Sequence, residues 1–205
     1  MAKLFDMDNP IWRFMGRVAD LFFLTVLWAV CSLPVFTIGA STTALYYVTL
    51  KMAENKAGYI LPSFFRAFRE NLGVSTLLWG IVLACGIFFG ADLYYWYHMG
   101  AGAATVMFWL SAVFAVLCVF MFILAFPLSA RLDAGAGKLV FMAFMVCLKN
   151  FSWTMLMVVT AACMLAVGVF VFWPLLFFAA GGIAYLHSVI LAKIVFPKYG
   201  WNETD

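Results

Sequence analysis

The residue best placed for buried acid–base chemistry in this 205-residue sequence is His187. It lies inside an apolar run, ten residues before Pro197, which corresponds to about 15 Å along a helix. A polar residue at such depth either joins neighbouring helices or marks a transport path. We interpret His187 as a contact between helices, with Ser188 or a facing helix as its partner.

Two aspartates lie in or beside apolar segments. Asp92 precedes the aromatic run 94–97 and His98, so a proton-linked pair of Asp92 with His98 is one candidate site. Such an aromatic run is typical of the membrane–water interface, where a carboxylate is hydrated, and we favour this second interpretation. Asp20 opens the first apolar segment, where it suits the positive end of a helix dipole or a nearby basic residue.

Hydroxyl groups gather in one short stretch, at Thr37, Ser41, Thr42 and Thr43. Pro34 and Gly39 interrupt the helical pattern there, which frees backbone groups. The hydroxyls either line a small polar cavity or hydrogen-bond these backbone groups, and we favour the second role.

No residue pattern indicates catalysis. The five cysteines lie in apolar segments and form no Cys-x-x-Cys pair, so neither a disulfide framework nor a metal site is predicted. Phosphate-binding loops and the common hydrolase and metalloprotease motifs are missing as well. We therefore expect a protein that is not an enzyme, with no catalytic residue, metal or cofactor.

The composition is that of a membrane protein. Hydrophobic residues make up 67% of the chain and charged residues 10%, against about 45–50% and 25% in soluble proteins. A soluble catalytic domain is excluded, and an all-α polytopic membrane protein with one integral membrane domain is predicted. Four apolar runs match the length of a membrane span, at 72–97, 104–130, 151–172 and 174–196. Chain reversals are predicted at Gly100–Gly102 and at Trp173–Pro174.

Residues 18–50 are harder to place. The helical segments 19–33 and 40–54 each give about 22 Å, which is short of a full crossing of about 30 Å. If this segment enters the membrane and returns, all 12 Lys and Arg residues fall on one side, and both termini are cytoplasmic. We predict a short or re-entrant hairpin. A single crossing, with five spans and an outside N-terminus, is the alternative.

Two amphipathic stretches, 63–72 and 138–150, are predicted to lie on the cytoplasmic surface. An offset of 79 pairs Asn71 with Asn150 and Phe65 with Phe144, and each stretch leads into two spans, which predicts a parallel repeat. The chain then divides into segments 1–58, 59–130 and 138–196. Basic residues beside apolar aromatics favour anionic lipid over nucleic acid as a partner.

Small residues predict two close helix contacts. Gly86 and Gly90 form a G-x-x-x-G pattern, and residues 179–182 form a second small-residue face. Both permit close approach of two backbones. We expect packing within the chain, with a homo-oligomer as the alternative.

Four N-terminal motifs resemble the YesL-like family of bacterial membrane proteins: Asp20-Leu21, Cys31-Ser32-Leu33-Pro34, the run 37–47 and the run 63–71. The likeness is specific over 9–80 and rests downstream on the order of the spans and on Lys149-Asn150. The resemblance implies a bacterial plasma membrane and a setting of carbohydrate utilisation, because many members are encoded beside carbohydrate ABC-transporter components. It implies no catalytic residues, since the family has no established activity.

These observations lead us to expect an accessory or regulatory protein of oligosaccharide uptake. Its expected partners are membrane lipids, carbohydrate ABC-transporter subunits or a second copy of the chain. The alternative is a small transporter or channel with a path beside His187 and the hydroxyls of Thr37, Ser41 and Thr42. A lipid-handling protein is a third option.

Overall fold

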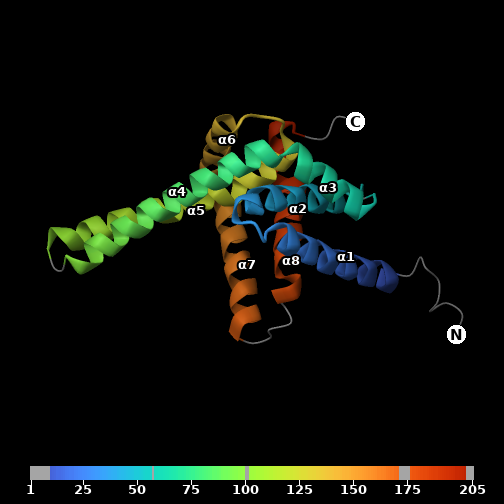
Figure 1. Ribbon diagram of the computed structural model, residues 1–205, viewed down its shortest axis with the longest axis horizontal. Helices are drawn as coiled ribbons and strands as arrows, with labels where there is room; N and C mark the ends of the chain where they lie inside the picture. The colour runs from blue at the N-terminus through green and yellow to red at the C-terminus, as the bar shows by residue number, and fades with distance from the viewer. Residues whose placement is uncertain (1–9, 57, 100–101, 171–175, 202–205) are drawn as a thin grey trace, which may run out of the picture.

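The computed structural model describes residues 10–56, 58–99, 102–170 and 176–201. These residues are almost entirely helical and include no strand (Figure 1). The α-helices are α1 (Pro10–Cys31), α2 (Ile38–Ala53), α3 (Ile60–Glu70), α4 (Leu72–His98), α5 (Ala103–Arg131), α6 (Ala136–Lys149), α7 (Phe151–Phe170) and α8 (Leu176–Ile190). A π-helical turn (Leu191–Val195) and a 3-10 turn (Phe196–Tyr199) continue α8. The predicted all-α class is confirmed.

Four helical stretches among the described residues are long and apolar enough to cross a membrane: Leu72–His98, Ala103–Arg131, Phe151–Phe170 and Phe178–Tyr199. They correspond to the four predicted spans, and only 11% to 39% of the residues in their most apolar windows are buried inside the molecule, as expected of helices that face lipid. The chain is a polytopic membrane protein. Trp173–Pro174 and the first two residues of the predicted reversal Gly100–Gly102 lie outside the described residues, whereas Gly102 has a φ of 91°.

The first hairpin differs from the prediction in the length of α1. This helix starts at Pro10, nine residues before the predicted start at 19, and proline suits the first helical position because its missing N–H is not needed there. Asp20 is therefore in the middle of α1, and its predicted place at the start of a helix is wrong. The 16 residues of α2 are fewer than the roughly 20 needed for a full span.

Both ends of the first hairpin lie together. Arg17 Nη2 donates a 3.0 Å hydrogen bond to Asn55 Oδ1, so the chain leaves α2 at the level where α1 passes Arg17. This contact agrees with a segment that enters and returns. A single crossing would separate Arg17 from Asn55 by the thickness of the membrane.

The centre of the molecule is α2, which contacts α1, α3, α4, α5 and α8. Three arms extend from it in different directions: α1, the α4–α5 hairpin and the α7–α8 hairpin (Figure 1). The short helices α3 and α6 and the C-terminal 3-10 turn lie away from the far ends of the two hairpins. Each short helix packs against the second helix of the preceding hairpin, α3 on α2 and α6 on α5.

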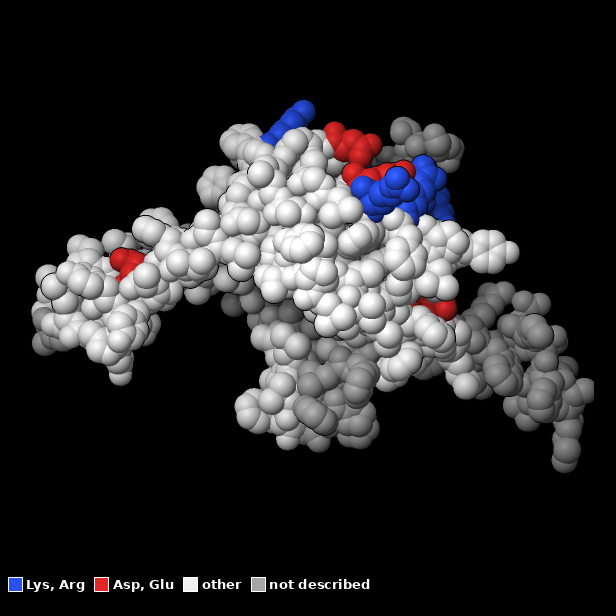
Figure 2. All heavy atoms as spheres, viewed as in Figure 1, with Lys and Arg blue, Asp and Glu red and all other residues white. Residues whose placement is uncertain are grey.

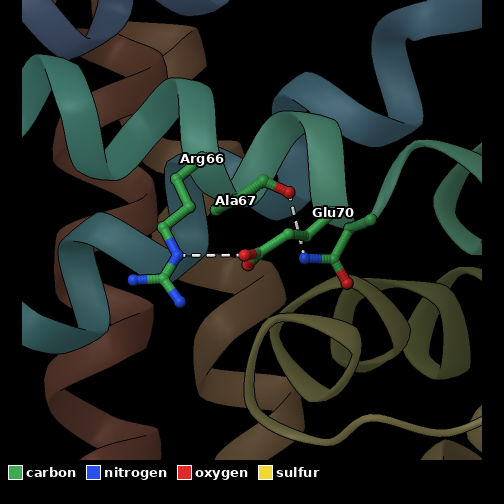
Figure 3. A network of polar contacts seen from close by, with 4 residues as sticks. Arg66, Ala67 and Glu70 are labelled. Carbon is green, nitrogen blue, oxygen red and sulfur yellow. Dashed lines mark hydrogen bonds and ion pairs between the residues drawn. The ribbon is translucent and has the colours of Figure 1, made fainter.

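The packing of the two units follows the predicted repeat. At an offset of 79 residues, the same positions are buried in both units, as the pairs Phe64/Ala143, Ala67/Val146, Ser75/Thr154 and Leu78/Met157. The junctions also match, because Asn71 Nδ2 donates to the carbonyl oxygen of Ala67 at 3.0 Å (Figure 3), and Asn150 Nδ2 to that of Val146 at 3.3 Å. Both units thus share one way of turning a surface helix into a spanning helix.

The exposed side of α3 carries an ion pair. Arg66 Nε and Glu70 Oε1 are 2.9 Å apart, one helical turn from each other (Figure 3). The hydrogen bond and charge of Glu70 raise the pKa of Arg66. This face is therefore polar, as expected of a helix at the membrane surface.

Gly39 fixes the distance between α2 and α4, which leads to a testable prediction. A Cβ atom here would overlap the carbonyl oxygen of Ser75 and lie 2.8 Å from Trp79 Cβ. Because a backbone oxygen cannot rotate away, Gly39→Ala is expected to lower the free energy of unfolding by about 1–3 kcal/mol. Gly80→Ala is the control, since a Cβ at Gly80 meets open space. The free energy of unfolding is measured in detergent. An equal loss for Gly39→Ala and Gly80→Ala would contradict this role of Gly39.

Candidate functional site

The buried polar centre of the molecule joins α2, α7 and α8. The hydroxyl of Tyr46 lies 3.0 Å from His187 Nδ1, and His187 Nε2 lies 2.9 Å from the carbonyl oxygen of Met157. A carbonyl oxygen only accepts, so Nε2 carries the proton and Nδ1 accepts from Tyr46. The imidazole is fully buried and bonded at both nitrogens, so its role in this structure is to join three helices.

Hydroxyls along α2 form hydrogen bonds to three of its neighbours, α1, α4 and α8. Thr49 and Ser188 of α8 are 2.8 Å apart, and Ser75 of α4 donates to Thr43 at 2.8 Å. Toward α1, Trp28 Nε1 donates to Thr42 at 3.1 Å. The short central helix is thus held by side-chain hydrogen bonds on several sides, which suits a segment buried among apolar helices.

The predicted hydroxyl cluster bonds to the backbone at the break between α1 and α2. Thr37 donates to the carbonyl oxygens of Cys31 (2.6 Å) and Pro34 (2.7 Å). Ser41 and Thr42 both donate to the carbonyl oxygen of Ile38, at 3.1 and 2.7 Å. The contacts of Thr37 correspond to the favoured interpretation, whereas Ser41 and Thr42 bond to a carbonyl oxygen inside the first turn of α2.

Asp92 and His98 have separate partners. Trp96 Nε1 donates to Asp92 Oδ1 at 3.0 Å, whereas the His98 ring lies against Tyr94, with Nδ1 2.9 Å from its carbonyl oxygen. The contacts do not join the two residues as a pair. They correspond to the interfacial interpretation of this aromatic segment.

Asp20 lines a hollow of about 410 Å³ beside the first turn of α3, together with Tyr59 and Ile60. Asp20 therefore lies beside the first turn of α3 and not at the start of α1.

Sequence reasoning missed a polar cluster where the C-terminal 3-10 turn meets the ends of α2, α5 and α6. Arg131 Nη2 and Glu54 Oε1 are 2.9 Å apart, with side chains only 8% and 18% exposed, and Arg131 Nε donates to the carbonyl oxygen of Trp201 at 3.0 Å. Nearby, Asn150 donates to the Tyr199 hydroxyl at 2.9 Å and accepts from Lys198 at 3.2 Å. We call these residues the C-terminal cluster. The pairing of residues 54 and 131 has no local sequence signal.

The basic side chains are unevenly distributed over the molecule. Figure 2 shows Lys and Arg side chains on the upper part of the molecule, and no blue on the α4–α5 arm in this view. Arg17, Arg131 and Lys198 contact groups at the same end of the described molecule. The positive-inside rule makes such an end the expected cytoplasmic one.

Two apolar cavities flank α2, and Thr42 and Tyr46 line both. The first, about 520 Å³, lies between α2, α4 and α5. The second, about 580 Å³, lies among α1, α2, α7 and α8. Carbon atoms dominate both walls, so these cavities suit hydrocarbon better than a sugar or an ion.

Of the two faces of small residues predicted to pack closely, only the one at 179–182 does so in the structure. Gly181 packs on α1, where a Cβ would lie 2.5 Å from the carbonyl oxygen of Leu21, so this face packs within the chain as predicted. Gly86 and Gly90 line the first cavity, and a Cβ on either would meet open space. The predicted packing of this pair within the chain is wrong, because the facing part of α5 presents small residues such as Ala115 and Cys118.

The cysteines are free thiols in the structure. Burial raises the pKa of the Cys147 thiol on α6, so this thiol is a poor nucleophile. Among the described residues, no three side chains of His, Cys, Asp or Glu are grouped as metal ligands. The candidate site is therefore a set of helix contacts and two apolar cavities.

Spanning helices, surface helices and a bonded central helix define the class as an all-α polytopic membrane protein. Residues 21–93 match the family model "Protein of unknown function, DUF624". "Uncharacterized protein YesL" of Bacillus subtilis (strain 168) is 27% identical over 204 residues, 97% of this chain and 94% of that protein. No solved structure matches. These findings confirm the predicted resemblance to the YesL-like family, and both matches are described as being of unknown function.

Proposed function

We propose that this protein is a non-enzymatic accessory or regulatory component of oligosaccharide uptake in the bacterial plasma membrane, with both termini in the cytoplasm. The carbohydrate setting comes from the resemblance to the YesL-like family. The position of the basic residues supports the orientation. One observation carries the accessory role: α6, which does not span the membrane, leaves an apolar face uncovered.

The uncovered face of α6 consists of four side chains spaced as on one side of a helix, each between 41% and 59% exposed: Phe141, Phe144, Met145 and Leu148. The opposite side of α6 is buried, at Leu139, Ala143 and Val146. Exposed lysines, Lys138 and Lys149, lie near the two ends. An apolar helix face with charged ends is a common surface for binding a partner helix. We assign it to a membrane subunit of the uptake system.

The alternative, a transporter or channel, receives less support from the contacts. A polar path needs groups that are free to bind a solute in turn. His187, Thr49 and Thr43 are instead bonded to neighbouring helices, and both cavities beside α2 have apolar walls. Moving a sugar past these residues would break the bonds that hold α2.

The docking face gives a direct test. We expect the wild-type protein, purified in mild detergent, to retain membrane subunits of the uptake system, and deletion of its gene to reduce oligosaccharide uptake. Phe144→Asp combined with Leu148→Asp should lower recovery about tenfold, as loss of a central apolar contact does in other interfaces. Phe65→Asp is the matched control, because Phe65 is the exposed equivalent of Phe144 on α3. If no subunit is recovered and uptake is unchanged, the proposal fails.

A further inference from the structure

The first cavity, between α2 and the α4–α5 hairpin, is large enough to hold a ligand. Its volume of about 520 Å³ lies within the roughly 300–1,000 Å³ of small-molecule sites. Small side chains open it on both walls: Cys85, Gly86 and Gly90 on α4, and Ala115 and Cys118 on α5. A cavity at this place was not predicted from the G-x-x-x-G pattern, which normally marks close helix packing.

The wall of this cavity has little capacity for a polar ligand. Its two hydroxyl groups belong to Thr42 and Tyr46. Thr42 donates to the carbonyl oxygen of Ile38 and accepts from Trp28, and Tyr46 bonds to His187. Apolar cavities without free polar partners do not hold ordered water. The chemistry of the wall therefore selects hydrocarbon.

The internal repeat indicates that the space is a local feature of this hairpin. At an offset of 79, three small residues of the cavity wall correspond to larger ones in α7, as Cys85/Met164, Gly86/Leu165 and Gly90/Val169. In two other pairs the larger residue is on α4, as Val82/Ala161 and Phe89/Gly168. In the α7–α8 hairpin the Met164 side chain fills the gap, since its Cε lies 2.6 Å from where a Cβ of Gly182 would be. The α4–α5 hairpin lacks such a filling side chain at Cys85.

We propose that this cavity binds one hydrocarbon chain of a membrane lipid. Two of the helices around it, α4 and α5, are long and apolar enough to span the bilayer, so acyl chains are the apolar molecules next to it. One turn of a helix about 10 Å wide has a volume of roughly 420 Å³, so the cavity holds little more than one turn of a second copy's helix. A flexible acyl chain fills such a space along its length. This site does not depend on the proposed role in uptake.

Filling the cavity tests the site. The variant Cys85→Met with Gly86→Leu introduces the residues that the repeat has at the equivalent positions. Gly80→Val is the matched control: it introduces the equivalent Val159, and Gly80 faces open space away from this cavity. After purification with phosphatidylglycerol and mild delipidation, native mass spectrometry should find one retained lipid on the wild type and on Gly80→Val. The filled variant should retain about tenfold less, because buried methylenes are displaced.

Thermal unfolding separates loss of the site from loss of the fold. Added phosphatidylglycerol should raise the Tm of the wild type and leave that of the filled variant unchanged. A second variant, Ala115→Leu, fills the cavity from α5, so that a folded protein with this change must also lose the retained lipid. Equal lipid retention in all variants overturns the proposal. Disulfide-linked dimers through Cys85 of the wild type would also overturn it, because they assign the cavity to a second copy.

Discussion

Replacing His187 with alanine is expected to lower the free energy of unfolding by about 3–5 kcal/mol. The imidazole is fully buried, and its removal leaves a cavity between α2, α7 and α8. The Tyr46 hydroxyl also loses its acceptor, and the Met157 carbonyl oxygen loses a donor. Equilibrium unfolding of the purified protein in mixed detergent micelles measures the change.

A double-mutant cycle assigns the part that comes from the Tyr46–His187 bond. Tyr46→Phe removes this hydrogen bond and keeps the ring, so we expect a loss of about 0.5–1.5 kcal/mol. The coupling between Tyr46→Phe and His187→Ala should be about 0.6 kcal/mol and no more than about 1.7 kcal/mol, the mean and the maximum measured for bonds between membrane helices. Asp92→Asn, at the far end of α4, should leave the unfolding free energy unchanged. A His187→Ala protein of wild-type stability would favour the transport interpretation.

The four spans could be predicted from sequence because a long apolar run has few alternatives to a spanning helix. All four boundaries of α4 (Leu72–His98) and α5 (Ala103–Arg131) lie within one residue of the predicted runs 72–97 and 104–130. The surface helices could also be predicted from sequence, since their charged and apolar residues alternate with the helical period. Local physical signals were sufficient for these elements.

The start of α1 shows where such signals fail. Hydropathy changes near residue 19, and the prediction placed the start of the first helix there. The backbone continues as a helix from Pro10, because a change from polar to apolar side chains does not by itself end a helix. Asp20 consequently moved from the start of a helix to its middle, next to the first turn of α3.

Contacts between distant residues account for the remaining differences. The G-x-x-x-G pattern on α4 gives no information on which side chains face it, and Ala115 and Cys118 leave Gly86 uncovered. His187 could be identified from its depth, but its partners Tyr46 and Met157 lie 141 and 30 residues away. The offset of 79 was more informative, since Ser75/Thr154 and Leu78/Met157 are buried alike. Repeats carry tertiary information that single segments lack.

The hydroxyls of α2 explain how a short helix remains at the centre of an apolar molecule. At 16 residues, α2 cannot expose both ends to water across the bilayer. Bonds from Thr43 to Ser75 and from Thr49 to Ser188 fix it to α4 and α8. Gly39 lets α2 approach α4 closely. The conformation of the whole chain depends on this element, because α4, α5 and α8 all pack on it.

Arg131→Ala should be comparably destabilising, with an expected loss of about 3–5 kcal/mol in unfolding free energy, the range for removing one partner of a buried ion pair. Arg131 is 8% exposed and Glu54 18%, so alanine leaves a largely buried carboxylate without its partner. The Trp201 carbonyl oxygen also loses its donor, which should release the C-terminal turns from α5. Limited proteolysis after residue 196, combined with equilibrium unfolding, measures both effects.

The exposed ion pair on α3 supplies the matched control. Arg66→Ala removes a partner of the same chemistry, but the side chains of Arg66 and Glu70 are 74% and 57% exposed, and water solvates the remaining carboxylate. Stability and proteolysis should then match the wild type. The double substitution Glu54→Leu with Arg131→Met should recover much of the loss, because an apolar pair needs no desolvation of charge. If Arg131→Ala lowers the free energy of unfolding no more than Arg66→Ala does, the C-terminal cluster does not hold α2 to α5. The three arms are then held together by the hydrogen bonds of α2 alone.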